Sequence, residues 1–167
     1  MTKLLPIAIA AIAASVTAMP IVAAHAAADA QRMKVSVDCR CADAVGQKFC
    51  SAFKQKVRES SNYRLVDTPV GVGMGVHLSS VDMWQGINGQ LLGRMSAMSV
   101  AFTIYADTLP GEIYEDSSVF RVGIDAVNDM TTKILAGLDQ LVTINATSIA
   151  ELRAGSNPKV TPIPPAH

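Results

Sequence analysis

The alternation of apolar and polar residues beyond about residue 30 predicts a series of strands and two helices. In "MKVSVDC", Val35, Val37 and Cys39 alternate with polar residues, which is the two-residue period of a half-buried strand. Over residues 43–60 the period changes to four, as on the buried stripe of a helix, with Asp43 expected as the N-cap. The residues of this stripe are Val45, Phe49, Phe53 and Val57. A short strand, "NYRLVD", follows the helix.

The segment "VGVGMGVHLSS", residues 70–80, has a glycine at every second position over three repeats. This even spacing fits neither the G-x-G-x-x-G pattern of dinucleotide-binding loops nor the P-loop pattern. Valine, methionine and leucine alternate with the glycines, so we predict a strand and not a phosphate-binding loop. One of its faces then carries Gly71, Gly73, Gly75 and His77.

Asn88-Gly89 is a sequence typical of a tight type I′ turn, and it precedes the next strand, "SAMSVAFTIYA". A strict two-residue turn would pair Gly75 with Phe102 and place the apolar side of the second strand on the glycine side of the first. A bulge or a longer loop would shift the register by one residue and align the two apolar faces. We expect the shifted register.

A further strand, "EIYEDSSVFRVGI", leads into a long helix for which Asp125 is the expected cap. The buried stripe of that helix would contain Val127, Met130, Ile134, Leu138, Leu141 and Val142. The order of elements predicts an α+β fold, a two-layer sandwich in which a mostly antiparallel sheet of four to five strands carries two helices on one face. The glycine-bearing face of the sheet is then open and available to a partner's strand or helix.

The ends of the chain differ from its middle. Residues 1–28 begin with Lys3, continue in an apolar run and end in small residues, which predicts a cleaved signal peptide; the alternative is an uncleaved membrane anchor. Residues 29–153 form one predicted α+β domain. Residues 154–167 hold four of the eight prolines and no periodicity, which predicts a disordered tail. We therefore expect a periplasmic or secreted protein of a Gram-negative bacterium, with no stable membrane insertion after cleavage.

Charge and cysteine content narrow the possible functions. The sequence has 14 basic and 14 acidic residues, so it lacks the positive excess typical of nucleic-acid-binding proteins. Of its three cysteines, Cys50 is expected to form a disulfide with Cys39 or Cys41, because exported proteins fold under oxidising conditions. Free buried thiols, a metal site and an intermolecular bridge are the alternatives.

No catalytic set is apparent in the sequence. His77, Ser79 and Asp82 are close in sequence, but residues 77 and 79 of one strand lie about 7 Å apart, too far for a direct hydrogen bond. The acids Glu112, Glu115 and Asp116 are typical of a solvated strand end. A soft-metal site would combine the cysteines with His77, Met95 and Met98, but the two methionines fall on opposite faces of a strand. We expect no enzyme activity, no cofactor and no bound metal.

The chain resembles the small periplasmic domains of the TolB N-terminal, LpoB and CsgG-like group. The resemblance rests on the export signal, the early strand, the helix ending in "RESSNYRLVD" and the meander closed by a helix. The similarity extends from about Val35 to Leu141; the chain differs by lacking a lipobox and by having the three cysteines. The resemblance implies a non-enzymatic module that binds other envelope proteins. The predicted partner-binding face consists of Gly71, Gly73, Gly75 and His77. The alternative is a periplasmic thiol-redox or soft-metal-binding protein that uses Cys39, Cys41 and Cys50. Partner identity and oligomeric state stay open.

Overall fold

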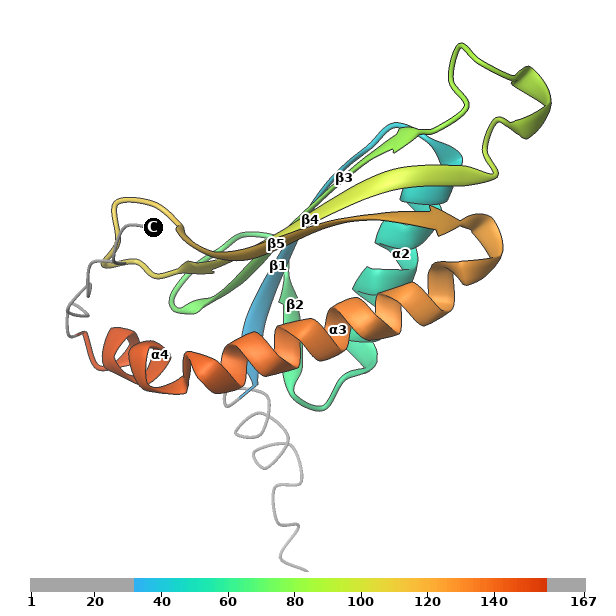
Figure 1. Ribbon diagram of the computed structural model, residues 1–167. Coiled ribbons are helices and arrows are strands. Elements are labelled where there is room, and N and C mark those ends of the chain that lie inside the picture. Colours follow the sequence, from blue (N-terminus) through green and yellow to red (C-terminus); the bar gives the residue numbers. More distant parts are fainter. Residues whose placement is uncertain (1–31, 156–167) are drawn as a thin grey trace, which may run out of the picture. The chain divides into compact units, whose positions relative to one another are not determined.

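A computed structural model describes residues 32–155, in which helices pack on one side of a sheet (Figure 1). The predicted signal peptide (residues 1–28) and all but the first two residues of the predicted tail (154–167) lie outside the described residues. The strands are β1 (Met33–Cys41), β2 (Tyr63–Val66), β3 (Gly73–Asp82), β4 (Met95–Tyr105) and β5 (Ile113–Gly123). The helices are α2 (Ala44–Glu59), α3 (Val127–Ile144) and α4 (Ala146–Arg153), with 3₁₀ turns at Gly89–Leu91 and Ile124–Ala126.

Within residues 32–155 the five strands form one sheet in the order β2-β1-β3-β4-β5. Strand β1 runs parallel to both of its neighbours, whereas β3, β4 and β5 form an antiparallel meander. The α+β class is confirmed, with one difference: the sheet is mixed rather than mostly antiparallel. The reason is that α2 returns the chain to the starting end of β1, so that β2 begins beside it and runs in the same direction.

The core lies between the sheet and the helices. All four residues of the predicted α2 stripe are fully buried, and Asp43 caps the helix by accepting a hydrogen bond from the Gly46 N–H, as predicted. The four stripe residues of α2 form one core cluster with apolar side chains of the sheet. These sheet residues are Val35, Val37, Met74, Val76, Leu78, Met98, Val100, Phe102 and Ile104. Helix α3 covers the same face, and its Leu138 is fully buried (Figure 1).

The last long helix of the structure differs from the prediction at both of its ends. Asp125 lies in the 3₁₀ turn before α3 and does not cap the helix, and the helical segment is divided at Asn145 into α3 and α4. The Asn145 side-chain amide donates to the Leu141 carbonyl and to Glu115 Oε2, which stabilises the break. Of the predicted stripe, Val127 and Leu138 are buried, and Met130, Ile134, Leu141 and Val142 are partly buried.

The β3–β4 register confirms the expected shift. Gly75 pairs with Thr103 and Val76 with Phe102, so the apolar residues of both strands face the helices. The predicted type I′ turn is wrong, because Asn88 has a φ of −146° where that turn needs a positive value. A longer loop connects the strands, and its length supplies the one-residue shift.

Gly46 allows α2 to approach the sheet closely. A Cβ on this residue would lie 1.9 Å from Ser80 Oγ and 2.9 Å from Cys41 Cβ. Gly46→Ala is therefore expected to destabilise the protein by about 1–3 kcal/mol, although alanine is normally the better helix former by about 1 kcal/mol. Gly137 in α3 has open space around its Cα, so Gly137→Ala is the matched control and should stabilise. Urea unfolding measures both; equal effects of the two substitutions would contradict this packing.

Candidate functional site

The sheet face opposite the helices carries the candidate site; we call it the helix-free face. It is formed by the alternate strand residues that point away from the core, as the register shows. Many are small: Ser36, Gly73, Gly75, Ser79, Ala97, Ser99 and Ala101. Three apolar side chains on this face are well exposed, Val81 (54%), Tyr114 (61%) and Val119 (80%). The face is therefore nearly flat, and its exposed apolar side chains are separate from one another.

The strand glycines lie on the helix-free face, but side chains of the neighbouring strand cover them. A Cβ on Gly73 would lie 2.5 Å from Cζ of the Tyr105 ring, and one on Gly75 would lie 2.2 Å from Thr103 Oγ1. Both glycines are buried, because side chains of the neighbouring strand β4 occupy the space above them. Gly71 lies before β3 with a φ of 76°, and its N–H donates to Asp107. A partner would meet the covering side chains, and the partner-binding role stays a prediction.

His77 is the centre of a polar cluster on the helix-free face. Its Nε2 lies 2.7 Å from Glu112 Oε2, and the same carboxylate oxygen accepts a hydrogen bond from Thr103 Oγ1. On the other side, His77 Nδ1 lies 3.7 Å from Asp38 Oδ2, to which Arg40 donates from Nε. Acidic and basic groups thus alternate across the face. The sequence did not reveal Asp38, Thr103 or Glu112 as neighbours of His77, because only the strand register places them there.

A shallow depression beside this cluster is lined by Asp38, Arg40, His77, Leu78, Ser79, Ser99 and Ala101. Ser79 Oγ and Ser99 Oγ share a hydrogen bond at 2.8 Å, so Ser79 is not paired with His77. Asp82 instead accepts from two backbone N–H groups of the following loop. The structure therefore does not bring His77, Ser79 and Asp82 together as a triad.

The three acidic residues predicted near the start of β5 each interact with a different partner. Glu112 contacts His77, Glu115 accepts from Asn145, and Asp116 accepts from the Ser117 N–H. Partial burial raises the pKa of Glu115, and the Asn145 hydrogen bond opposes this rise. They do not form a carboxylate pair of the kind that acid–base catalysis uses.

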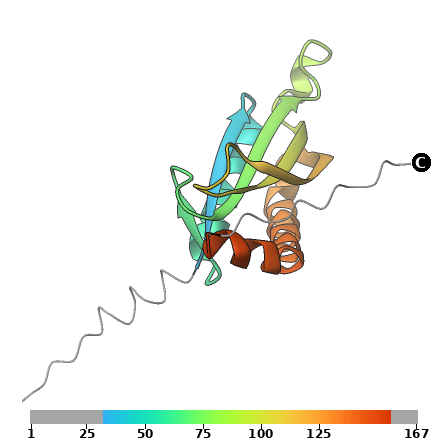
Figure 2. The same cartoon turned by 90° about the vertical axis from the view of Figure 1, so that its left-hand side faces the viewer.

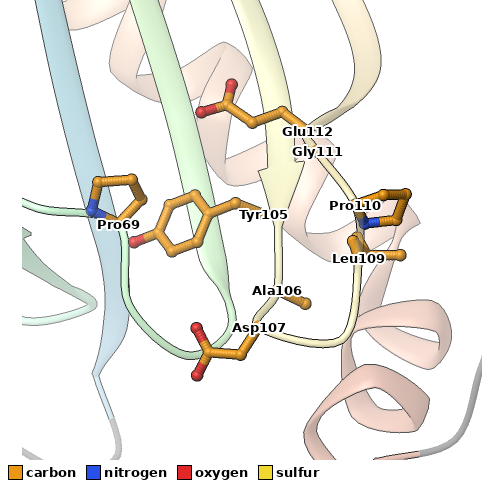
Figure 3. A pocket seen from close by; sticks show the side chains of 8 residues that line it. All are labelled: Pro69, Tyr105, Ala106, Asp107, Leu109, Pro110, Gly111 and Glu112. Atoms are coloured by element: carbon orange, nitrogen blue, oxygen red, sulfur yellow. The ribbon is translucent and has the colours of Figure 1, made fainter.

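A second hollow lies where β4 ends (Figure 3). It is lined by Pro69, Tyr105, Ala106, Asp107, Leu109, Pro110, Gly111 and Glu112. The Tyr105 hydroxyl is buried and has no hydrogen-bond partner among the described residues. Burial raises the pKa of Tyr105 to about 12, and the negative charge of Glu112 adds to the rise. This phenol stays protonated at neutral pH and acts as packing over Gly73.

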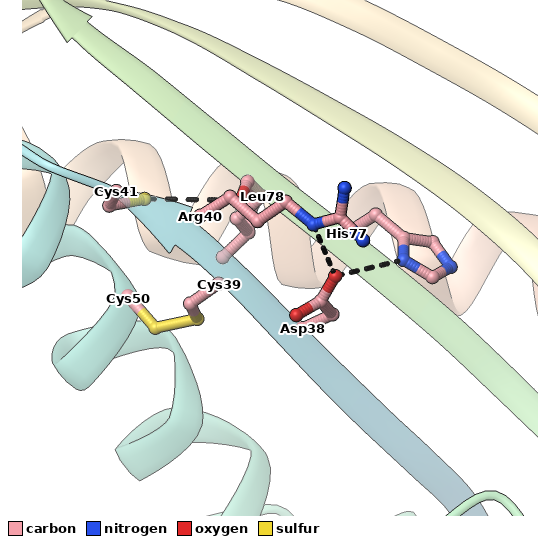
Figure 4. Close-up of a disulfide and its surroundings, with 7 residues drawn as sticks. All are labelled: Asp38, Cys39, Arg40, Cys41, Cys50, His77 and Leu78. Carbon is pink, nitrogen blue, oxygen red and sulfur yellow. Dashed lines mark hydrogen bonds and ion pairs between the residues drawn. A yellow bond between two sulfur atoms is a disulfide. The ribbon is translucent and has the colours of Figure 1, made fainter.

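Cys39 and Cys50 form a disulfide, which joins β1 to α2 with the two Cα atoms 6.3 Å apart (Figure 4). This confirms the expected bridge and selects Cys39 over Cys41, which is free. Both candidates occupy the helix-facing side of β1, but Cys41 lies beside Gly46, one helical turn before Cys50. A structural disulfide indicates an oxidising compartment.

The soft-metal interpretation is not supported by this arrangement. The cysteines lie on the helix side of the sheet, whereas His77 lies on the helix-free face, and Met98 is buried in the core. Within residues 32–155, no three side chains of histidine, cysteine, aspartate or glutamate are grouped as metal ligands.

The Cys41 thiol is expected to react slowly. Burial raises its pKa, the nearby Asp43 charge adds to the rise, and a hydrogen bond with Ser80 opposes it. Because the thiolate is the reactive form, native protein should be alkylated at Cys41 at least about tenfold more slowly than urea-unfolded protein at neutral pH. Mass spectrometry after timed iodoacetamide treatment measures the rate. Equal rates in native and unfolded protein would mean that Cys41 is accessible and activated.

Comparisons with known proteins assign no family. No family model matches the chain. No curated protein sequence matches it either. One solved structure with some similarity is a minor lipoprotein from Acinetobacter baumannii, with a TM-score of 0.31 and 15% identity, covering 77% of this chain and 96% of that one. At this TM-score we draw no functional conclusion, and the resemblance to the TolB N-terminal group stays a prediction. Between residues 32 and 155 the structure has no helix long and apolar enough to cross a bilayer.

Proposed function

We propose that this protein is a non-catalytic interaction module of the bacterial envelope that binds another protein through its helix-free face. The observation that carries this proposal is the uncovered face itself. The described helices pack on the other side of the sheet, and Val81, Tyr114 and Val119 stay exposed on this one. A sheet face that no described helix covers can receive a strand or helix of a partner protein.

The state of the polar groups on this face also favours binding over catalysis. His77 lies between Asp38 and Glu112, and Arg40 donates to Asp38, so these four charged or titratable groups already have partners on the face before a protein binds. The disulfide and the predicted signal peptide are consistent with an exported protein.

Site-specific photo-crosslinking in cells tests this proposal. A photoreactive amino acid at Val119 should crosslink to a discrete envelope protein, and the same probe at Thr132, exposed on α3, is the matched control. The adduct should weaken at least about tenfold when Tyr114 is replaced by aspartate, because a charge would then be buried in the interface. Equal crosslinking from Thr132, or none from Val119, would refute the helix-free face as the binding surface.

The thiol-redox alternative has one observation in its favour, the free Cys41 two residues from the bridged Cys39. Its partial burial and raised pKa disfavour a role as attacking thiol. Reversible turnover of the Cys39–Cys50 bridge in the cell, followed by alkylation and mass spectrometry, would favour the redox alternative over the interaction module.

A further inference from the structure

The connection between β3 and β4, residues 83–94, is an ordered projection that the proposed function does not use. It extends beyond the end of the sheet in both views of the molecule (Figures 1 and 2). Residues 83–93 include no charged side chain. Ile87 is 77% exposed and Leu92 is 50% exposed, and Trp84 and Leu91 are partly exposed beside them. Several apolar side chains on a projecting tip indicate a contact surface.

The backbone of this loop is held by its own hydrogen bonds. The Asp82 carboxylate closes the base by accepting from the Trp84 N–H at 2.7 Å and the Gly93 N–H at 2.6 Å. At the tip, the Asn88 side chain accepts from the Gln90 N–H. Altogether nine of the twelve backbone N–H groups from residue 83 to residue 94 donate within the loop or to its base. Most backbone N–H groups of the loop therefore need no partner outside it.

We infer that this loop inserts its tip into the interfacial layer of a lipid bilayer. Lipid offers few hydrogen-bond partners, so a segment that enters it must satisfy most of its backbone N–H groups internally, as this loop does. A pocket on a partner protein would supply such partners and would not require this property. The absence of charge removes the main cost of insertion, and tryptophan beside aliphatic residues is the composition typical of membrane interfaces. The contact is peripheral and shallow.

Trp84 is the single tryptophan of the sequence, so its fluorescence reports on this loop without any label. On addition of phosphatidylcholine vesicles, the Trp84 emission should shift to shorter wavelength, and vesicles of brominated phosphatidylcholine should quench it. Because residues 83–93 are uncharged, adding phosphatidylglycerol to the vesicles or raising the salt concentration should change binding by less than about twofold.

A pair of double variants makes the test specific. Ile87→Ser with Leu92→Ser should lower the vesicle partition coefficient at least about tenfold, because it removes the two most exposed aliphatic groups of the loop. Tyr114→Ser with Val119→Ser removes comparable exposed groups from the helix-free face and should leave vesicle binding unchanged. All four positions are exposed, and urea unfolding verifies that each variant is folded. Every variant is purified after export, so any effect of residues 1–28 is common to all.

The result that would overturn this inference is an unchanged Trp84 spectrum with vesicles, or an equal loss of binding in the two double variants. A photoreactive group at Ile87 that crosslinks to one protein, in a chain that does not bind vesicles, would show that the loop enters a protein pocket instead. Failure here is distinguishable from failure of the proposed function, because crosslinking from Val119 probes the helix-free face alone.

Discussion

Replacing Asp43 with alanine is expected to lower the free energy of unfolding by about 3 kcal/mol. The Asp43 carboxylate accepts hydrogen bonds from the Gly46 N–H, from Ser80 of β3 and from Ser96 of β4. It therefore caps α2 and joins that helix to two strands. Loss of a cap costs about 0.5–2 kcal/mol and hydrogen bonds to a charged group contribute about 1.5–3 kcal/mol each, although such contributions are not fully additive. Ser96 is fully buried, so its hydroxyl would lose its partner without gaining water.

The pH dependence of stability gives a second readout for Asp43. Partial burial alone would raise the pKa of this carboxyl, but the hydrogen bonds from Ser80, Ser96 and Gly46 outweigh it and hold the pKa below its ordinary value of 3.8. As the pH falls, the unfolded chain therefore binds this proton before the folded chain does. The stabilisation is fully present above the ordinary pKa and is lost as the pH falls through the folded-state value.

Asp43→Asn is the matched variant, because it keeps the size and the capping oxygen but removes the charge. We expect it to cost less than Asp43→Ala at about pH 7, and its difference from wild type should shrink at about pH 3. Urea unfolding at the two pH values measures both effects. A constant difference between wild type and Asp43→Asn at both pH values would show that the charge of Asp43 does not stabilise the fold.

Removal of the Cys39–Cys50 bridge is expected to cost about 3 kcal/mol. The bridge closes a loop of 11 residues in sequence separation, and the chain-entropy model gives about this value for a loop of that length. The double variant Cys39→Ala with Cys50→Ala is the appropriate test. A single Cys39→Ala substitution would leave the Cys50 thiol of α2 free to pair with Cys41, which lies on the side of β1 that faces α2.

Cys41→Ala is the control for this prediction, because Cys41 is free. It should keep the disulfide, seen as a mass unchanged by alkylation without reductant, and should shift the urea midpoint much less than the double variant. A larger loss of stability in Cys41→Ala than in the double variant would mean that Cys41 belongs to the bridge in solution.

The sequence by itself determined the types of the elements and the residues they bury. The four-residue period of Val45, Phe49, Phe53 and Val57 identified the buried side of α2, and all four are in the core. The alternation in β4 required the shifted register, because only that register puts its apolar side chains on the helix side with those of β3. These are local patterns, because the period of apolar residues along a segment identifies which of its side chains point to the core.

Only the tertiary structure decided which distant residues meet. Cys39 pairs with Cys50 because α2 lies close to the sheet, as the small Gly46 allows. His77 contacts Glu112, 35 positions further along the chain, because of the β3–β4 register and the course of the chain after β4. The direction of β1 and the covering of the strand glycines by Tyr105 and Thr103 were equally invisible in the sequence. Periodicity defines the faces of an element, but the contacts across those faces depend on strand order, register and packing, which arise only when the whole chain folds.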